Sequence, residues 1–249
     1  MATSGVSSIS PLGGVVAVVA TYNERENLER LIERLRRVAP WLDLLVVDDD
    51  SPDGTGDLAD ALAARPSARL WVIHRRGERG LGGAVLAGFR WALARGYEAV
   101  LTMDADLSHR PEDLPAVLRA AEGADVVVGS RFAPGGKTEG LSSARRAFSR
   151  AVSGLCRLLL GVRAADVGSN YRYYRADLLR RLGLERLRSR GYSFQEEMLF
   201  RAGRAGARIV EVPITFARRQ GGESKVSAGE VFRSLALVLQ LSLERFDRG

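Results

Sequence analysis

Residues 99–106 read Ala-Val-Leu-Thr-Met-Asp-Ala-Asp, an apolar run that ends in two carboxylates. Such a run predicts a buried strand, and the carboxylates follow at the point where that strand should emerge into solvent. Because side chains alternate along a strand, Asp104 and Asp106 are expected to lie on the same face. Two like charges at this spacing repel each other unless a cation lies between them. The alternative is a solvated pair that caps the following helix.

A hard divalent cation suits this pair of carboxylates. Mg²⁺ in proteins is commonly held by one or two carboxylates together with the phosphates of a substrate. The segment therefore predicts a metal site at Asp104 and Asp106, in an enzyme that acts on a nucleotide diphosphate.

Strands and helices alternate outward from this segment. Short apolar runs predict strands at 15–20, 42–47, 70–73, 99–103, 126–128 and 208–214. Helical periodicity and helix-start signals predict helices that begin near Asn23, Thr55 and Pro111, and others over 81–95, 142–160 and 226–246. This alternation predicts an α/β fold with a mostly parallel, Rossmann-like central sheet and helices on both faces.

Polar clusters follow four of the predicted strands, at 21–24, 48–53, 104–106 and 130–131. In open α/β sheets, ligands bind at the carboxyl ends of the strands, so one edge of the sheet should gather all four clusters. We expect Asp49 to accept hydrogen bonds from a nucleobase and Tyr22 to lie against the base. Asn23 is expected only to cap the helix that follows.

Three cations are candidates for neutralising the charge of a departing diphosphate: Arg131, Arg219 and Lys225. For each of them the alternative is a solvated surface side chain, because the chain carries a net charge of +7. His109 lies close to the acidic pair in sequence and is expected to support it.

Composition excludes several classes of protein. A single cysteine, Cys156, rules out an internal disulfide and a cysteine-rich zinc site, and it favours the cytoplasm. The sequence isoelectric point is about 10.1, but no basic stripe with interleaved aromatic residues is present, so we expect no nucleic-acid partner. The sequence contains no run of 18 or more apolar residues, so it predicts no membrane span.

The sequence also predicts how the chain is organised. We expect a disordered tail at 1–13, a single catalytic domain at 14–225 and a C-terminal amphipathic, apolar helix at 226–249.

The chain resembles family 2 glycosyltransferases of GT-A fold, and more narrowly the polyprenol (dolichol) phosphate mannosyl synthases. The matching motifs are Thr-Tyr-Asn-Glu (21–24), Val-Asp-Asp-Asp-Ser-Pro-Asp-Gly-Thr (47–55), Gly-Leu-Gly (80–82), Met-Asp-Ala-Asp-Leu-Ser-His (103–109), Gly-Ser-Arg-Phe (129–132), Gly-Tyr-Ser-Phe-Gln-Glu-Glu-Met (191–198), Glu-Val-Pro-Ile-Thr-Phe (211–216) and the segment from Arg219 to Lys225. The chain departs from the family pattern at Ala20, Leu141, 168–170 and Arg218.

This resemblance implies GDP-mannose as donor, a polyprenyl phosphate as acceptor, Mg²⁺ or Mn²⁺ as cofactor, and inversion at the anomeric carbon. It assigns the guanosine site to Ala20, Tyr22, Glu24, Val47 and Asp49, the metal and donor to Asp104, Ala105 and Asp106, and the phosphates to Arg131, Arg219 and Lys225. The alternatives are another nucleotide-sugar, a saccharide acceptor, or a protein that binds a nucleotide-sugar without catalysis.

A lipid acceptor implies contact with a membrane. The helix predicted over 142–160 is basic on one side and apolar on the other, which suits an anionic bilayer surface. We therefore expect peripheral attachment to the cytoplasmic face. For the helix predicted over 226–246 there are three alternatives: it packs on the core, it lies in the membrane interface, or it binds a membrane-anchoring partner subunit.

Overall fold

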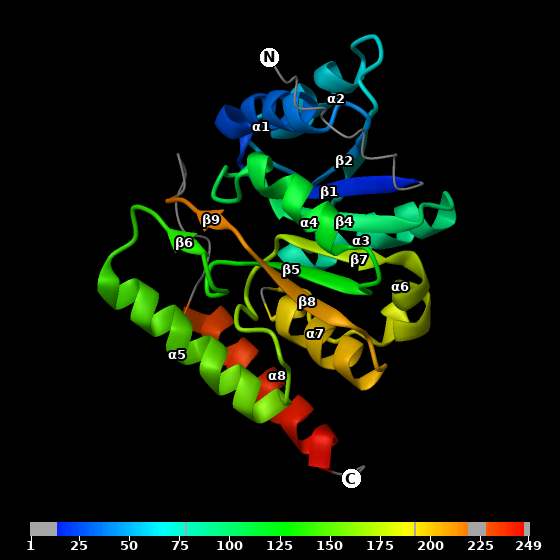
Figure 1. The fold of residues 1–249 in the computed structure, drawn as a ribbon. Helices are drawn as coiled ribbons and strands as arrows, with labels where there is room; N and C mark the ends of the chain where they lie inside the picture. Colours follow the sequence, from blue (N-terminus) through cyan, green and yellow to red (C-terminus); the bar gives the residue numbers. More distant parts are fainter. Residues whose placement is uncertain (1–13, 78, 192, 219–227, 247–249) are drawn as a thin grey trace, which may run out of the picture.

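A computed structural model describes residues 14–77, 79–191, 193–218 and 228–246 of the chain. Within them, a seven-stranded sheet of order β3-β2-β1-β4-β7-β5-β8 forms the centre of the molecule (Figure 1). Its strands are β1 (Val15–Thr21), β2 (Asp43–Asp48), β3 (Leu70–His74), β4 (Ala99–Asp104), β5 (Val126–Ser130), β7 (Arg172–Arg175) and β8 (Ile209–Pro213). A second, two-stranded sheet pairs β6 (Lys137–Thr138) with β9 (Thr215–Phe216).

The large sheet is mostly parallel. Strands β1, β2, β3 and β4 run in the same direction, and β5 is parallel to β8. Strand β7 lies antiparallel between β4 and β5. The predicted α/β architecture with a mostly parallel sheet is thus confirmed, whereas β7 was not predicted.

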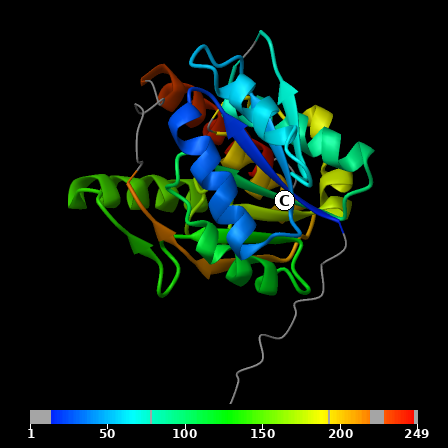
Figure 2. The same ribbon diagram turned by 90° about the horizontal axis from the view of Figure 1, so that it is seen from above.

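Helices cover both faces of the sheet. They are α1 (Arg25–Val38), α2 (Thr55–Ala63), α3 (Leu81–Ala94), α4 (Leu114–Ala120), α5 (Ser143–Leu160), α6 (Ala176–Leu182), α7 (Phe194–Arg204) and α8 (Ala228–Phe246), with short 3₁₀ helices at Pro111–Asp113 and Leu184–Arg186. Because side chains alternate along β1, Val15 and Ala17 pack with α1, α2 and α4, while Val16 and Val18 pack with α3, α6 and α7. Helices α5 and α8 lie at the margin of the molecule and add to the core on the side of α3, α6 and α7 (Figures 1 and 2).

The expectation that Asn23 caps α1 is wrong. Asn23 has a left-handed backbone (φ 56°), and its N–H donates to Ser51 Oγ at 3.0 Å. The first N–H groups of the helix are instead satisfied by the loop after β2, since Thr55 Oγ1 accepts from Glu24 N at 2.9 Å and Asp53 Oδ2 accepts from Arg25 N at 3.1 Å. These partners are distant in sequence, so a local capping pattern could not reveal them.

Gly88 allows α3 to pack closely on β1. A Cβ added there would lie 2.4 Å from Val18 Cγ1, inside a fully buried core. We therefore expect Gly88→Ala to lower the free energy of unfolding by about 1–3 kcal/mol in urea titrations. Gly203 in α7 is the matched control, because a Cβ there meets nothing within 4 Å. Gly203→Ala should raise stability by about 0.5–1 kcal/mol through helix propensity. Equal effects of the two substitutions would contradict this account.

Candidate active site

The carboxyl ends of β1, β2, β4 and β5 meet at one edge of the large sheet. Ala20 on β1 pairs with both Val47 on β2 and Asp104 on β4, so the ends of these three strands lie side by side. The expectation that one edge gathers the polar clusters after these strands is confirmed, and the candidate active site lies there.

Asp104 is held from two sides at the end of β4. Its Oδ1 accepts a hydrogen bond from Asn170 Nδ2 at 2.9 Å, and its backbone N–H donates to His109 Nδ1 at 3.2 Å. Asp104 keeps 31% of its side-chain surface exposed. Asp106 is buried, and its Oδ1 accepts from Ser108 N at 2.9 Å. Ala105, between them, is buried in the core.

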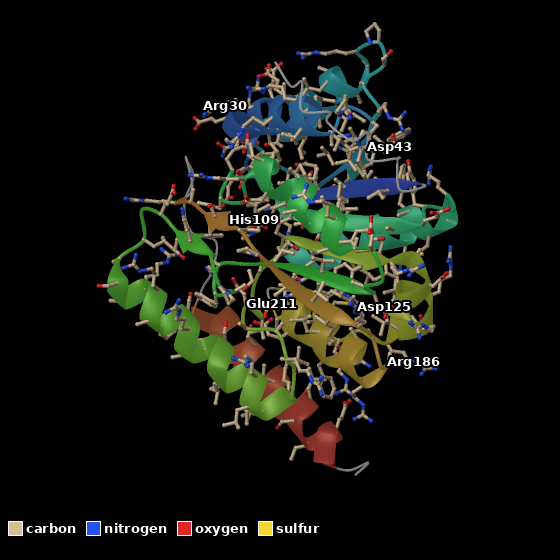
Figure 3. The ribbon with its side chains drawn as sticks, in the orientation of Figure 1. Arg30, Asp43, His109, Asp125, Arg186 and Glu211 are labelled. Atoms are coloured by element: carbon tan, nitrogen blue, oxygen red, sulfur yellow. The ribbon has the colours of Figure 1, made fainter. Side chains whose placement is uncertain are left out.

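His109 supports the acidic pair, as expected from its place in the sequence. Figure 3 marks its place in the molecule. It is almost fully buried and contacts the rings of Tyr171 and Phe216, whose centroids lie 5.3 and 5.5 Å from its own. Because Nδ1 accepts from Asp104 N–H, the imidazole holds the backbone at this strand end.

The acidic pair fits a divalent cation that shares its coordination with a ligand. Among the described residues, no group of three or more His, Cys, Asp or Glu side chains converges as a complete protein metal site. Two carboxylates at a partly exposed strand end match the way Mg²⁺ binds, with substrate phosphates and water supplying the remaining ligands.

The predicted nucleotide site lies around the ends of β1 and β2. The Asp49 carboxylate is buried, accepts from Gly80 N at 2.8 Å and is paired with Arg75. Burial raises the pKa of Asp49, against the opposing effects of Gly80 N–H and Arg75. Arg79 lies over the Tyr22 ring, 4.7 Å from its centroid, and donates to the Tyr22 hydroxyl at 2.8 Å.

The other residues of the predicted nucleotide site differ in exposure. Ala20 is partly exposed. Glu24 is buried and accepts from Asn27 Nδ2 at 2.9 Å. The Val47 side chain is fully buried in the core, so contact with a ligand there would have to come from the backbone.

Arg131, just after β5, is fixed by a bidentate ion pair. Its Nε and Nη2 donate to Asp166 Oδ2 and Oδ1 at 2.9 and 3.2 Å. Glu211 on β8 holds the loop of Asp166, because its carboxylate accepts from Ala165 N at 2.7 Å and from Asp166 N at 3.1 Å (Figure 3). The Arg131 guanidinium also lies over the Phe216 ring, which contacts His109. Arg131 and the acidic pair therefore belong to one connected site.

A cavity of about 470 Å³ opens beside Arg131, between the loop after β5 and α5. Three arginines line it, together with uncharged residues: Arg131, Phe132, Gly136, Thr138, Ser143, Arg146, Ala147 and Arg150. The sequence predicts the basic side of α5 but not its position beside Arg131. The signal was the four-residue spacing of Arg146 and Arg150, which places both on one side of a helix. Arg219 and Lys225 lie outside the described residues, so their predicted role stays a prediction.

Glu196, at the start of α7, has a carboxyl oxygen that is buried without a hydrogen-bond partner. Burial raises the pKa of Glu196 from 4.5 to about 7, against the opposing effects of a hydrogen bond from its own backbone N–H and of the Arg172 charge. A raised pKa in the folded state means that folding favours the protonated Glu196 carboxyl. The stability that comes from burying Glu196 in this protonated form is present below pH 4.5 and is lost as the pH rises through about 7.

We therefore expect Glu196→Gln to raise the free energy of unfolding at pH 8 by on the order of 2–3 kcal/mol relative to the unmodified protein. The difference should shrink toward zero near pH 5 in paired urea titrations. Glu26→Gln, on the exposed side of α1, is the control and should show no such pH dependence. A Glu196→Gln effect of equal size at both pH values would refute the assignment.

Comparison with known proteins defines the class. The sequence profile of Glycosyl transferase family 2 matches residues 16–183, and the chain belongs to that family. Its fold is the GT-A fold of these enzymes, as expected. The structure is similar to that of glucosyl-3-phosphoglycerate synthase of Mycobacterium tuberculosis, which was solved with Mn²⁺, UDP and phosphoglyceric acid. The TM-score is 0.66 at 20% sequence identity, and the match covers 94% of this chain and 78% of that one.

Closer sequence relatives narrow the subclass. An undecaprenyl-phosphate mannosyltransferase of Micrococcus luteus is 50% identical over 92% of this chain and 94% of its own. A polyprenol monophosphomannose synthase of Mycolicibacterium smegmatis is 42% identical over 97% and 92%. A dolichol-phosphate mannosyltransferase of Pyrococcus furiosus is 34% identical over 91% of this chain and 63% of its own. The resemblance inferred from the motifs is thereby confirmed.

Proposed function

We propose that this glycosyltransferase moves mannose from GDP-mannose to a polyprenyl phosphate, with inversion at the anomeric carbon. The observation that carries this proposal is the arginine-lined cavity beside Arg131, which suits a phosphate-bearing acceptor. The names of relatives at 50% and 42% identity support the same acceptor and sugar.

The lining of this cavity favours a phosphate over a sugar hydroxyl as the attacking group. None of the described lining residues is a carboxylate or a histidine, so the cavity itself offers no general base. A phosphate monoester needs none, because its second pKa lies near 6 and it is an anion at neutral pH. Its oxygen can attack the anomeric carbon directly, opposite the departing diphosphate, which gives inversion.

The side chains of the enzyme then contribute by positioning the acceptor phosphate and by neutralising the charge of the diphosphate leaving group. Arg131, Arg146 and Arg150 would bind and orient the acceptor phosphate, while the Asp166 ion pair keeps Arg131 in place. Asp104 and Asp106 would hold Mg²⁺ or Mn²⁺, which supplies positive charge to the diphosphate leaving group. Asp49 and Tyr22 would contact the guanosine, and Arg219 and Lys225 the phosphates.

A lipid acceptor also calls for attachment to a membrane. Helices α5 and α8 pack together and expose large apolar side chains: Phe148 (65%), Val152 (39%), Leu155 (46%), Leu158 (74%), Leu235 (43%), Leu239 (48%) and Leu243 (65%). Exposed Arg145 and Arg157 lie on the same helix as four of them. None of the described helices is long and apolar enough to cross a membrane. An apolar surface flanked by arginines suits peripheral binding to the anionic cytoplasmic face.

Turnover of radiolabelled GDP-mannose with a polyprenyl phosphate tests the proposed reaction. We expect a lipid-soluble labelled product, loss of activity with a chelator, and recovery with Mg²⁺ or Mn²⁺. A panel of nucleotide-sugars in competition tests the donor. Transfer to a saccharide hydroxyl in place of the lipid phosphate, or binding of the nucleotide-sugar without turnover, would support the corresponding alternative.

Flotation with vesicles tests the proposed attachment. The protein should bind vesicles that contain anionic lipid and should be released by moderate salt, because screening weakens the arginine contribution. Leu158→Ser with Leu243→Ser should reduce binding at least severalfold, whereas Trp71→Ser, on β3, should not. Binding that appears only with added membrane proteins would indicate a partner subunit instead.

A further inference from the structure

We propose that Asn170 and Gln195 form an amide relay that positions Asp104 and thereby sets the affinity of the site for its divalent cation. The relay is the pair of hydrogen bonds that runs from Gln195 through Asn170 to Asp104. This inference rests on the proposed metal site, and it assigns a role to two buried residues that do not themselves touch the metal.

The hydrogen bonds of the relay have a fixed direction. The Asp104 carboxylate can only accept, so Asn170 must present its Nδ2 group to Oδ1, at 2.9 Å. Asn170 Oδ1 then points the other way and must accept. Gln195 Nε2 donates to it at 2.6 Å. Asp104 thus selects the Nδ2 end of the Asn170 amide, and Gln195 holds the opposite end in place.

Both amide residues are anchored through their backbone carbonyls. Asn170 O accepts from Thr102 Oγ1 at 2.7 Å, and Thr102 lies two residues before Asp104 on β4. Gln195 O accepts from Arg172 Nη1 at 2.7 Å, and Arg172 is itself fully buried. Asn170 and Gln195 are 3% and 2% exposed, so solvent does not compete for these bonds. The relay therefore connects Asp104 to the rigid contact between β7 and α7.

Packing alone does not account for Gln195. Its Oε1 is buried without a hydrogen-bond partner, and the Nε atom of the neighbouring Arg172 is in the same state. An unsatisfied buried polar atom is destabilising, whereas an apolar side chain of similar shape avoids that loss. The amide is accordingly explained by what its other end does, which is to donate to Asn170.

Loss of Gln195 should act on the metal through Asn170. Without its donor, the buried Asn170 Oδ1 loses its partner, and the Asn170 amide is held less firmly in the position from which Nδ2 donates to Asp104 Oδ1. Residues that orient metal ligands typically change metal affinity by about 10–100-fold when they are replaced.

Titration of Mn²⁺ in the presence of saturating GDP, followed by the electron paramagnetic resonance of free Mn²⁺, tests the relay without any assay of turnover. Asn170→Ala should weaken Mn²⁺ binding by about tenfold, and Gln195→Met by about threefold to tenfold. The double variant should match Asn170→Ala alone, because Gln195 acts only through Asn170. Gln240→Met, on the exposed side of α8, is the matched control and should leave the affinity unchanged.

Three outcomes would overturn the proposal. Unchanged Mn²⁺ affinity in Asn170→Ala removes the relay. Additive losses in the double variant show that Gln195 acts directly. Equal weakening of GDP binding with and without Mn²⁺ shows a general structural defect, so GDP affinity in chelator is measured for each variant. Asp104→Ala separates this inference from the proposed metal site. If Asp104→Ala leaves the Mn²⁺ affinity unchanged, the metal assignment itself fails. If Asp104→Ala lowers the Mn²⁺ affinity but Asn170→Ala does not, only the relay is rejected.

Discussion

Asp104→Ala is expected to lower the rate of mannosyl transfer by about 10²–10³ while the protein remains folded. The substitution removes one of the two carboxylates proposed to hold the cation that neutralises the leaving diphosphate. Because the Asp104 side chain is partly exposed at a strand end, its loss opens no cavity in the core. Asp106→Ala should have an effect of similar size. The measurement is kcat at saturating donor and acceptor, across a titration of Mg²⁺ and Mn²⁺.

Asp177→Ala provides the control for these two substitutions. Asp177 lies on α6, its side chain is 77% exposed, and its partner Arg180 is also on the surface. It should retain full activity. If Asp104→Ala and Asp106→Ala both turned over at the normal rate, the acidic pair would have no part in the reaction.

Arg131→Met is expected to produce two separable losses. The first is a fall in kcat/KM of about 10²–10³, because a preorganised cation is removed from the proposed phosphate cavity. The second is a loss of stability of about 3 kcal/mol, because the almost fully buried Asp166 carboxylate keeps its charge and loses its partner. Arg131→Lys should recover only part of either property, since lysine cannot form the bidentate pair.

The double variant Arg131→Met with Asp166→Asn distinguishes the two losses. Removing both charges should restore most of the stability in urea titrations but none of the activity. Arg65→Met is the control, because its ion pair with Glu29 lies on the surface and is worth about 1 kcal/mol or less. Recovery of activity together with stability would mean that Arg131 acts only by supporting the fold.

Most of the sheet could be predicted from the sequence. Strands β1 to β5 and β8 are short apolar runs, four of which end at polar clusters, and their predicted bounds agree with the structure to within two residues. The gathering of those clusters at one edge followed from parallel strand direction alone. The predicted support of Asp104 by His109, five residues further along the chain, is seen in the hydrogen bond from Asp104 N to His109 Nδ1.

Strand β7 and its contribution to the site could not be predicted in the same way. Its four residues, Arg-Tyr-Tyr-Arg at 172–175, carry charges at both ends and show no apolar run. The strand exists because β4 and β5 pair with it on either side. Just before it lies Asn170, in a segment that departs from the family pattern, and its contact with Asp104 spans 66 residues of sequence.

The sequence by itself determined the α/β class, the parallel strands and the placement of the acidic pair at a strand end, because these depend on local periodicity and on the chemistry of neighbouring residues. Only the tertiary structure decided which groups orient that pair and where a phosphate could bind. The amide relay and the Arg131–Asp166 ion pair join segments that are distant in the chain, and the arginine-lined cavity forms between α5 and the loop after β5. Their geometry arises when the sheet, α5 and α7 pack together, and no local pattern encodes it.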